Sequence, residues 1–184
     1  MSEQPFYTQP FFWAFISMLG LALATSLFTK HKYRRSIILV SIALVFTTIG
    51  RVVIVLPFCA QPRLELAGWN WIVGGIVFIF GLMVSVGPLF QVKWWEAPKD
   101  GMTLKKTGIY GFVRHPIYLC EVLWFLGWSI IFQSVYGLAL VPVWWFVFWT
   151  HTLAEEGELI DILGEDYKNY MKEVKGRIFP GLPL

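Results

Sequence analysis

Five apolar segments constrain the fold of this 184-residue chain more than any other feature of its sequence. They cover residues 11–28, 36–57, 69–90, 117–133 and 138–153. A helix needs about 20 apolar residues to cross the hydrocarbon core of a bilayer, and these segments reach or approach that length. Hydrophobic residues make up 57% of the chain and charged residues only 15%, against about 45–50% and about 25% in soluble domains. The sequence therefore predicts an integral membrane protein, and it excludes a disordered chain, a coiled coil and a soluble nucleic-acid-binding protein.

The segments predict an all-α, polytopic membrane protein with about five transmembrane helices. The last two segments are short and are separated by a turn around Ser134–Gly137, so we expect them to form a tight helical hairpin. We expect residues 154–184 to form a cytosolic helical tail, because this stretch is rich in charged residues. The chain reads as a single membrane-embedded domain over residues 1–184. Residues 1–90 form its three-helix N-terminal part, and residues 91–184 carry most of its polar groups.

The basic residues predict an orientation in the membrane. Of the 15 Lys and Arg residues, 13 lie between the first and second segments, between the third and fourth, or after the fifth. Cytosolic loops carry such an excess of basic residues. We therefore expect a multi-pass protein of the cell membrane with its N-terminus outside and its C-terminus in the cytosol. The stretch before the first segment has no basic residue, which argues against a cleaved signal peptide. The short N-terminus and the absence of extra spans favour a prokaryotic inner membrane.

A polar run directly before the fourth segment is the first candidate site. Pro116 suits the first turn of a helix, so Arg114 and His115 lie just before a helix N-terminus, where free N–H groups favour an anion. With Tyr110 and Tyr118 nearby, the combination favours a ligand site. The simpler interpretation is that Arg114 binds lipid phosphates and His115 caps the helix.

Acidic residues near the membrane supply the second candidate site. Glu155 and Glu156 follow the fifth segment, and His151 lies four residues before Glu155, on the same helix face. An alternative is a solvated acidic helix end. Glu121 lies inside the fourth segment, where an acid is expensive and suggests function; it would otherwise pair with Arg114, seven residues earlier.

Other common sites are not expected. The sequence has neither a glycine-rich dinucleotide fingerprint nor a P-loop. His31, His115 and His151 are far apart and the two cysteines form no pair, so we expect no metal site.

Four blocks in the second half of the chain resemble the isoprenylcysteine carboxyl methyltransferase and phospholipid methyltransferase superfamily of small membrane enzymes. The blocks are Thr107–Tyr110 with Arg114–Tyr118, then Glu155–Glu156, then Gly164–Tyr170, then Arg177–Pro180. The resemblance covers about residues 101–181. It implies methyl transfer from S-adenosylmethionine to a lipophilic small molecule or lipid at the cytosolic membrane interface, by the part of the chain in residues 91–184.

The resemblance also implies roles for single residues. The cofactor would be bound by Met102, Thr103, Leu104, Lys105, Tyr110, His115, Pro116, Ile117, Tyr118, Glu155 and Glu156. Glu155 would hold the charged end of the cofactor. The chemistry agrees, because Arg114 or a helix N-terminus could bind the carboxylate of the cofactor. We expect His151, Arg114 and Glu121 to serve the reaction itself.

Two departures from the superfamily pattern bear on the acceptor. Cys120 stands where the family usually has Gly, and His151 stands where isoprenylcysteine methyltransferases carry an Arg four residues before the Glu. A histidine orients a carboxylate less firmly than an arginine, and a neutral imidazole can accept a proton. Carboxylate, amine, thiol and hydroxyl acceptors all stay open, as does a merely hydrogen-bonding role for His151.

A second superfamily shares part of the pattern. Membrane sterol and steroid double-bond reductases that use NADPH also carry Arg-His-Pro-x-Tyr followed by an acid, which Glu121 matches. They are usually longer and have more spans. Methyl transfer is therefore the preferred function, and the reductase is the alternative.

Overall fold

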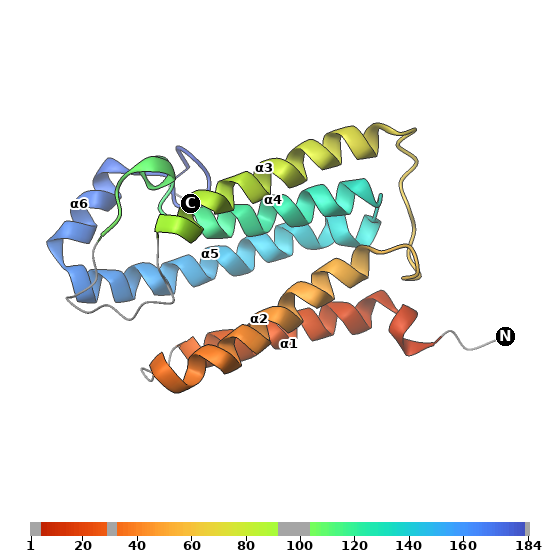
Figure 1. The fold of residues 1–184 in the computed structure, drawn as a ribbon, viewed down its shortest axis with the longest axis horizontal. Helices are drawn as coiled ribbons and strands as arrows, with labels where there is room; N and C mark the ends of the chain where they lie inside the picture. Colours follow the sequence, from red (N-terminus) through yellow and green to blue (C-terminus); the bar gives the residue numbers. More distant parts are fainter. Residues whose placement is uncertain (1–4, 29–32, 92–103, 183–184) are drawn as a thin grey trace. The chain divides into compact units, whose positions relative to one another are not determined.

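The computed structural model describes residues 5–28, 33–91 and 104–182. Within these residues the chain is helical and forms no strand, apart from one isolated bridge between Arg63 and Ser134. The elements in chain order are η1 (Phe6–Thr8), α1 (Pro10–Phe28), α2 (Tyr33–Val55), α3 (Trp69–Gln91), η2 (Gly108–Gly111), α4 (Pro116–Ile131), α5 (Val135–Leu163) and α6 (Glu165–Glu173) (Figure 1). The predicted all-α class is confirmed for this part of the chain.

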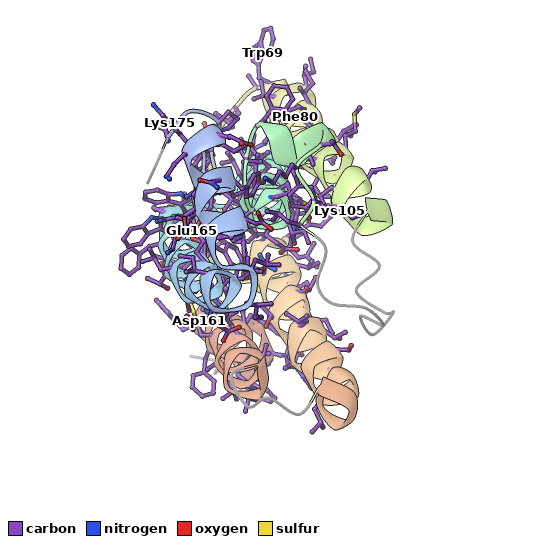
Figure 2. All side chains as sticks on the ribbon, turned by 90° about the vertical axis from the view of Figure 1, so that its left-hand side faces the viewer. Trp69, Phe80, Lys105, Asp161, Glu165 and Lys175 are labelled. Carbon is purple, nitrogen blue, oxygen red and sulfur yellow. The ribbon has the colours of Figure 1, made fainter. Side chains whose placement is uncertain are left out.

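Each of the helices α1 to α5 contains most of one of the five predicted segments. In the part of the chain that the structure describes, two stretches are long and apolar enough to cross a membrane, Trp69–Pro88 and Val135–Leu163. Three shorter apolar stretches are Pro10–Ala24, Ser41–Val55 and Pro116–Ile131. Large apolar side chains such as Trp69 (66% exposed) and Phe80 (56%) project outward from α3, as Figure 2 shows. These features indicate a membrane protein, whereas five crossings stay a prediction.

The second arm of the hairpin is longer than the sequence suggested. We expected it to end near Leu153, where the apolar residues end, but α5 continues as a helix to Leu163. The charged stretch contains good helix formers, and no proline interrupts it. The helix ends at Gly164, whose φ of +59° is readily adopted only by glycine, and α6 begins at the next residue. Glu155 and Glu156 therefore lie on a continuous helix.

Two compact units divide the chain. One comprises residues 1–74 and 128–139, and the other residues 75–127 and 140–184. The predicted division at residue 90 and the single membrane-embedded domain stay predictions. Every residue of the candidate site described below that the structure places lies in the second unit.

In the first unit, α1 and α2 lie side by side and approach closely (Figure 1). A Cβ added at Gly20 would lie 2.7 Å from the Ala43 carbonyl oxygen, and one at Gly50 would lie 2.6 Å from the Trp13 carbonyl oxygen. Only glycine allows such contacts, which are typical of membrane helix pairs. The Ser17 hydroxyl adds a hydrogen bond to the Thr47 carbonyl at 2.7 Å.

Beyond α2, one basic side chain joins the ends of two helices. Arg63 donates from Nη1 to the carbonyl oxygens of Val55 at 2.6 Å and Phe132 at 2.7 Å. The last carbonyls of a helix have no partner within the helix, so a guanidinium satisfies them. These two hydrogen bonds hold the loop between α4 and α5 against the end of α2, within the first unit.

In the second unit, aromatic and small residues pack α3, α4 and α5 together. Gly81 of α3 lets the backbone of α4 approach, since an added Cβ would lie 2.7 Å from the Trp124 nitrogen. The ring centres of Tyr118 on α4 and Phe148 on α5 lie 5.4 Å apart, and those of Phe148 and Trp144 lie 5.6 Å apart. This packing fixes the start of α4 beside the charged part of α5.

Candidate active site

A cluster of charged side chains joins the start of α4, the charged end of α5 and the segment after α6. It consists of Arg114, His115, Glu155, Glu156 and Arg177. Arg114 and His115 are 6% exposed and Glu156 only 3%, so three charged or titratable groups are buried together. Buried charges are tolerated only where they are paired and hydrogen-bonded.

Glu156 is the centre of the cluster. Its Oε1 atom accepts a hydrogen bond from Arg114 Nε at 2.7 Å and lies 3.3 Å from His115 Nε2. Its Oε2 atom accepts from Arg177 Nε at 3.1 Å, and Arg177 Nη2 lies 3.0 Å away. Both carboxylate oxygens are therefore occupied by groups of the protein.

Glu155, the neighbouring acid, has a different environment. Its side chain is 47% exposed, and its Oε2 atom lies 3.5 Å from His115 Nδ1. The Tyr118 hydroxyl lies near this carboxylate. Of the two acids, only Glu155 presents a carboxylate that a bound molecule can reach.

Main-chain hydrogen bonds hold the residues before α4 against the segment after α6. Arg114 N donates to the Gly176 carbonyl and His115 N to the Arg177 carbonyl, both at 2.9 Å. The Arg114 side chain also donates from Nη1 to the carbonyl oxygens of Val174 at 2.6 Å and Lys175 at 3.0 Å. The segment after α6 therefore fixes both the backbone and the guanidinium of Arg114.

Tyrosines of α6 close the cluster on another side. Tyr167 and Tyr170 are each 2% exposed and form a small core with Val174, against which Leu104 packs. The Tyr170 hydroxyl donates to the Tyr110 carbonyl at 2.7 Å, and Figure 1 shows α6 beside η2. Burial raises the pKa values of Tyr110 and Tyr170 to about 12, so both stay neutral near pH 7.

The pKa of His115 depends on both acids of the cluster. Burial acts to lower its pKa, but the carboxylates of Glu155 and Glu156 outweigh burial and hold the pKa of His115 above its ordinary value. The imidazolium is therefore stabilised between two acids. Contacts of both ring nitrogens, from Nε2 to Glu156 at 3.3 Å and from Nδ1 to Glu155 at 3.5 Å, fix the orientation of the ring.

The structure places the other predicted residues in different ways. Met102 and Thr103 lie outside the described residues. Lys105 is exposed, as is Ile117 at 42%, and Pro116 begins α4 as expected (Figure 2 labels Lys105).

Two residues predicted to serve the reaction, Glu121 and His151, are not members of the cluster. Glu121 accepts a hydrogen bond from Trp124 Nε1 at 3.0 Å, while Arg114 pairs with Glu156. His151 is partly buried on α5, one turn before Glu155. A role of either residue in the reaction stays a prediction.

Two features of the sequence point to the contacts that were not predicted. Residues Trp144, Phe148, Thr152 and Glu156 are spaced four apart and are all buried, so the buried stripe of α5 ends on Glu156 rather than Glu155. Arg177 belongs to a block that carries the family resemblance, but its distance from Glu156 in the sequence hid their contact.

Comparison with known proteins agrees with the resemblance. Residues 66–166, more than half of the chain, match the family described as Phospholipid methyltransferase. Protein-S-isoprenylcysteine O-methyltransferase of Homo sapiens is 29% identical over 130 residues, which cover 67% of this chain and 44% of that protein. The enzyme of the same name from Dictyostelium discoideum is 31% identical over 121 residues, covering 61% of this chain and 50% of that protein.

A further relative is named for a different methyl acceptor. Methanethiol S-methyltransferase of Pseudomonas deceptionensis is 30% identical over 118 residues, covering 61% of this chain and 44% of that protein. The chain thus spans about half the length of the relatives it matches. The family match includes Arg114, His115, Glu155 and Glu156, so the resemblance is confirmed, and the chain belongs to the phospholipid methyltransferase family.

Proposed function

We propose that the protein is an integral membrane methyltransferase that methylates a lipophilic acceptor with S-adenosylmethionine at the cytosolic membrane interface. The observation that carries the proposal is the exposed Glu155 carboxylate, fixed by His115 within a chain of this family. The relatives reported above are named methyltransferases, so the reductase alternative is not favoured.

The residues present suit the amino-acid end of the cofactor. That end carries an ammonium and a carboxylate. Glu155 is a half-exposed acid for the ammonium, and the free N–H groups in the first turn of α4, beginning at Pro116, suit a carboxylate. The cofactor would supply a methyl group on a positively charged sulfur, open to attack by a nucleophile.

Arg114 then has a positioning role in place of direct contact with the cofactor. Its guanidinium is 4% exposed and is held by Glu156 and two carbonyl oxygens. It therefore keeps the segment after α6 against the start of α4. Holding two reactants aligned contributes roughly 7–11 kcal/mol toward lowering a barrier, so rigid support of this kind matters.

The proposed topology places the site on the cytosolic side. The basic residues flanking the site belong to the predicted cytosolic loops. A polar cofactor would then reach the site from the cytosol and a lipophilic acceptor from the bilayer. Five crossings, an outside N-terminus and a prokaryotic inner membrane are part of this proposal.

We further propose that His151 accepts the proton of a thiol, amine or hydroxyl acceptor. His151 lies on α5 one turn before Glu155, on the side from which an acceptor reaches the cofactor. One relative is named for a thiol acceptor, methanethiol. An imidazole can take such a proton, and an arginine cannot.

Ligand protection tests the methyltransferase proposal. We expect S-adenosylhomocysteine to raise the thermal unfolding midpoint of the detergent-solubilised protein, and NADPH to leave it unchanged. Glu155→Gln should abolish this protection, whereas Glu158→Gln, at an exposed acid further along α5, should keep it. Protection by NADPH alone would contradict the proposal.

Turnover tests the role of His151. His151→Ala should lower kcat far more than it weakens cofactor binding, and the wild-type rate should rise with pH as the imidazole loses its proton. His151→Arg should not restore the rate. An Arg variant as fast as wild type would exclude the base and favour a carboxylate acceptor.

A further inference from the structure

Arg177 supplies the cluster with a second guanidinium from outside the membrane helices. It lies in the segment after α6, and its side chain is only 12% exposed. Both Nε, at 3.1 Å, and Nη2, at 3.0 Å, contact the same oxygen of Glu156. No role was expected for this residue from the sequence.

The two oxygens of Glu156 have separate partners, and this separation gives Arg177 its importance. Oε1 is shared by Arg114 and His115, whereas Arg177 contacts Oε2. Without Arg177, a buried oxygen would lose its charged partner, which is costly in a low-dielectric site. The carboxylate would then rotate to share its remaining donors. The His115 contact, at 3.3 Å, would loosen before the Arg114 contact, at 2.7 Å.

Arg177 also holds His115 through the main chain. The Arg177 carbonyl accepts the hydrogen bond from His115 N at 2.9 Å. The imidazole in turn places Nε2 toward Glu156 and Nδ1 toward Glu155 Oε2, at 3.3 and 3.5 Å. A path of contacts therefore leads from Arg177 through Glu156 and His115 to the exposed acid.

We propose that Arg177 is a positioning residue that fixes the exposed carboxylate of Glu155 by way of Glu156 and His115. The proposal rests on the proposed function, because it assigns Glu155 to the ammonium of the cofactor. Arg177 does not touch the cofactor in this scheme. The segment after α6 thus becomes part of the binding site without lining it.

Isothermal titration of the full-length protein in detergent with S-adenosylhomocysteine tests this role. Arg177→Met should raise Kd by roughly tenfold or more, as for supporting partners of metal-holding side chains, while the binding stoichiometry stays that of wild type. Arg177→Lys keeps the charge but has only one donor nitrogen, so its Kd should lie between those of wild type and Arg177→Met. Lys172→Met removes a charge from the exposed surface of α6 and should bind like wild type.

A role in stability alone gives a different result. Arg177→Met would then lower the stoichiometry, because fewer molecules are folded, and leave Kd unchanged. That result overturns the proposal, as does an unchanged Kd at full stoichiometry. If Arg177→Met fails to fold, the Kd and the binding stoichiometry of Arg177→Lys decide between the two roles.

Nitrogen NMR of ¹⁵N-histidine-labelled protein gives a readout that needs no ligand. The chain has three histidines, and the His115 signals are assigned by their loss in His115→Gln. Arg177→Met should shift the His115 ring signals, since its Nε2 contact to Glu156 changes, and Lys172→Met should not. Unmoved His115 signals overturn the positioning role. If Arg177→Met shifts the His115 signals but the wild-type protein binds no S-adenosylhomocysteine, the result contradicts the proposed function and not the positioning role.

Discussion

Gly176→Ala should destabilise the protein, because the segment after α6 leaves no space for a methyl group at this position. An added Cβ would lie 2.7 Å from the Phe179 carbonyl oxygen, 2.8 Å from the Phe112 carbonyl oxygen and 3.0 Å from the Gly181 nitrogen. All three neighbours are backbone atoms, so no side-chain rotation relieves the contact. Overpacking of this kind costs about 1–3 kcal/mol. A chain of this size loses about 2–4 °C of melting temperature per kcal/mol.

Gly157→Ala is the matched control for this substitution. Gly157 lies within α5, and nothing lies within 4 Å of an added Cβ. Alanine is favoured over glycine in a helix by about 1 kcal/mol, so this variant should melt higher than wild type. Thermal unfolding in detergent, monitored by circular dichroism, measures the melting temperatures of both variants. A Gly176→Ala protein that melts at or above wild type would refute the steric argument.

Three further substitutions test other contacts of the cluster. Arg114→Met should cost about 3–5 kcal/mol, because it leaves Glu156 with one buried partner fewer; a melting point within the error of wild type would contradict this. Tyr170→Phe should cost about 0.5–1.5 kcal/mol by removing the hydrogen bond to the Tyr110 carbonyl, and an unchanged denaturation curve would show that the bond contributes nothing. The melting temperature should fall as the pH rises above neutral, and His115→Gln should flatten that fall. Folding raises the pKa of His115. The stability that His115 contributes is therefore fully present below pH about 6.5, the ordinary pKa of histidine, and is lost as the pH rises through the raised pKa.

The positions of the apolar helices were predictable because apolar run length is a local property. Each of the five predicted segments became a helix, and the start of α4 at Pro116 follows from the fixed φ of proline. The end of α5 was not predicted, because apolar content changes at Leu153 while helix propensity does not. Hydropathy marks where lipid contact ends, and the chain stays helical beyond that point.

Pairings within the cluster were harder to predict. Spacing along one helix offered Glu121 as a partner for Arg114, only seven residues away. The observed partner, Glu156, is 42 residues away and belongs to another helix. Such a contact depends on how α4 and α5 pack, and this packing is set by shape complementarity between aromatic side chains that spacing does not encode.

The division of work between the two adjacent acids follows from helix geometry. Neighbouring residues on an α-helix point about 100° apart, so a helix whose buried stripe passes through Thr152 must turn Glu156 inward and Glu155 away from it. The inward acid is then neutralised by Arg114 and Arg177, and His115 lies between the two carboxylates. An inward acid without those cations would not stay charged, and an outward acid without His115 would move freely. The pair therefore works only as a unit, in which the buried acid holds the imidazole and the imidazole holds the accessible acid.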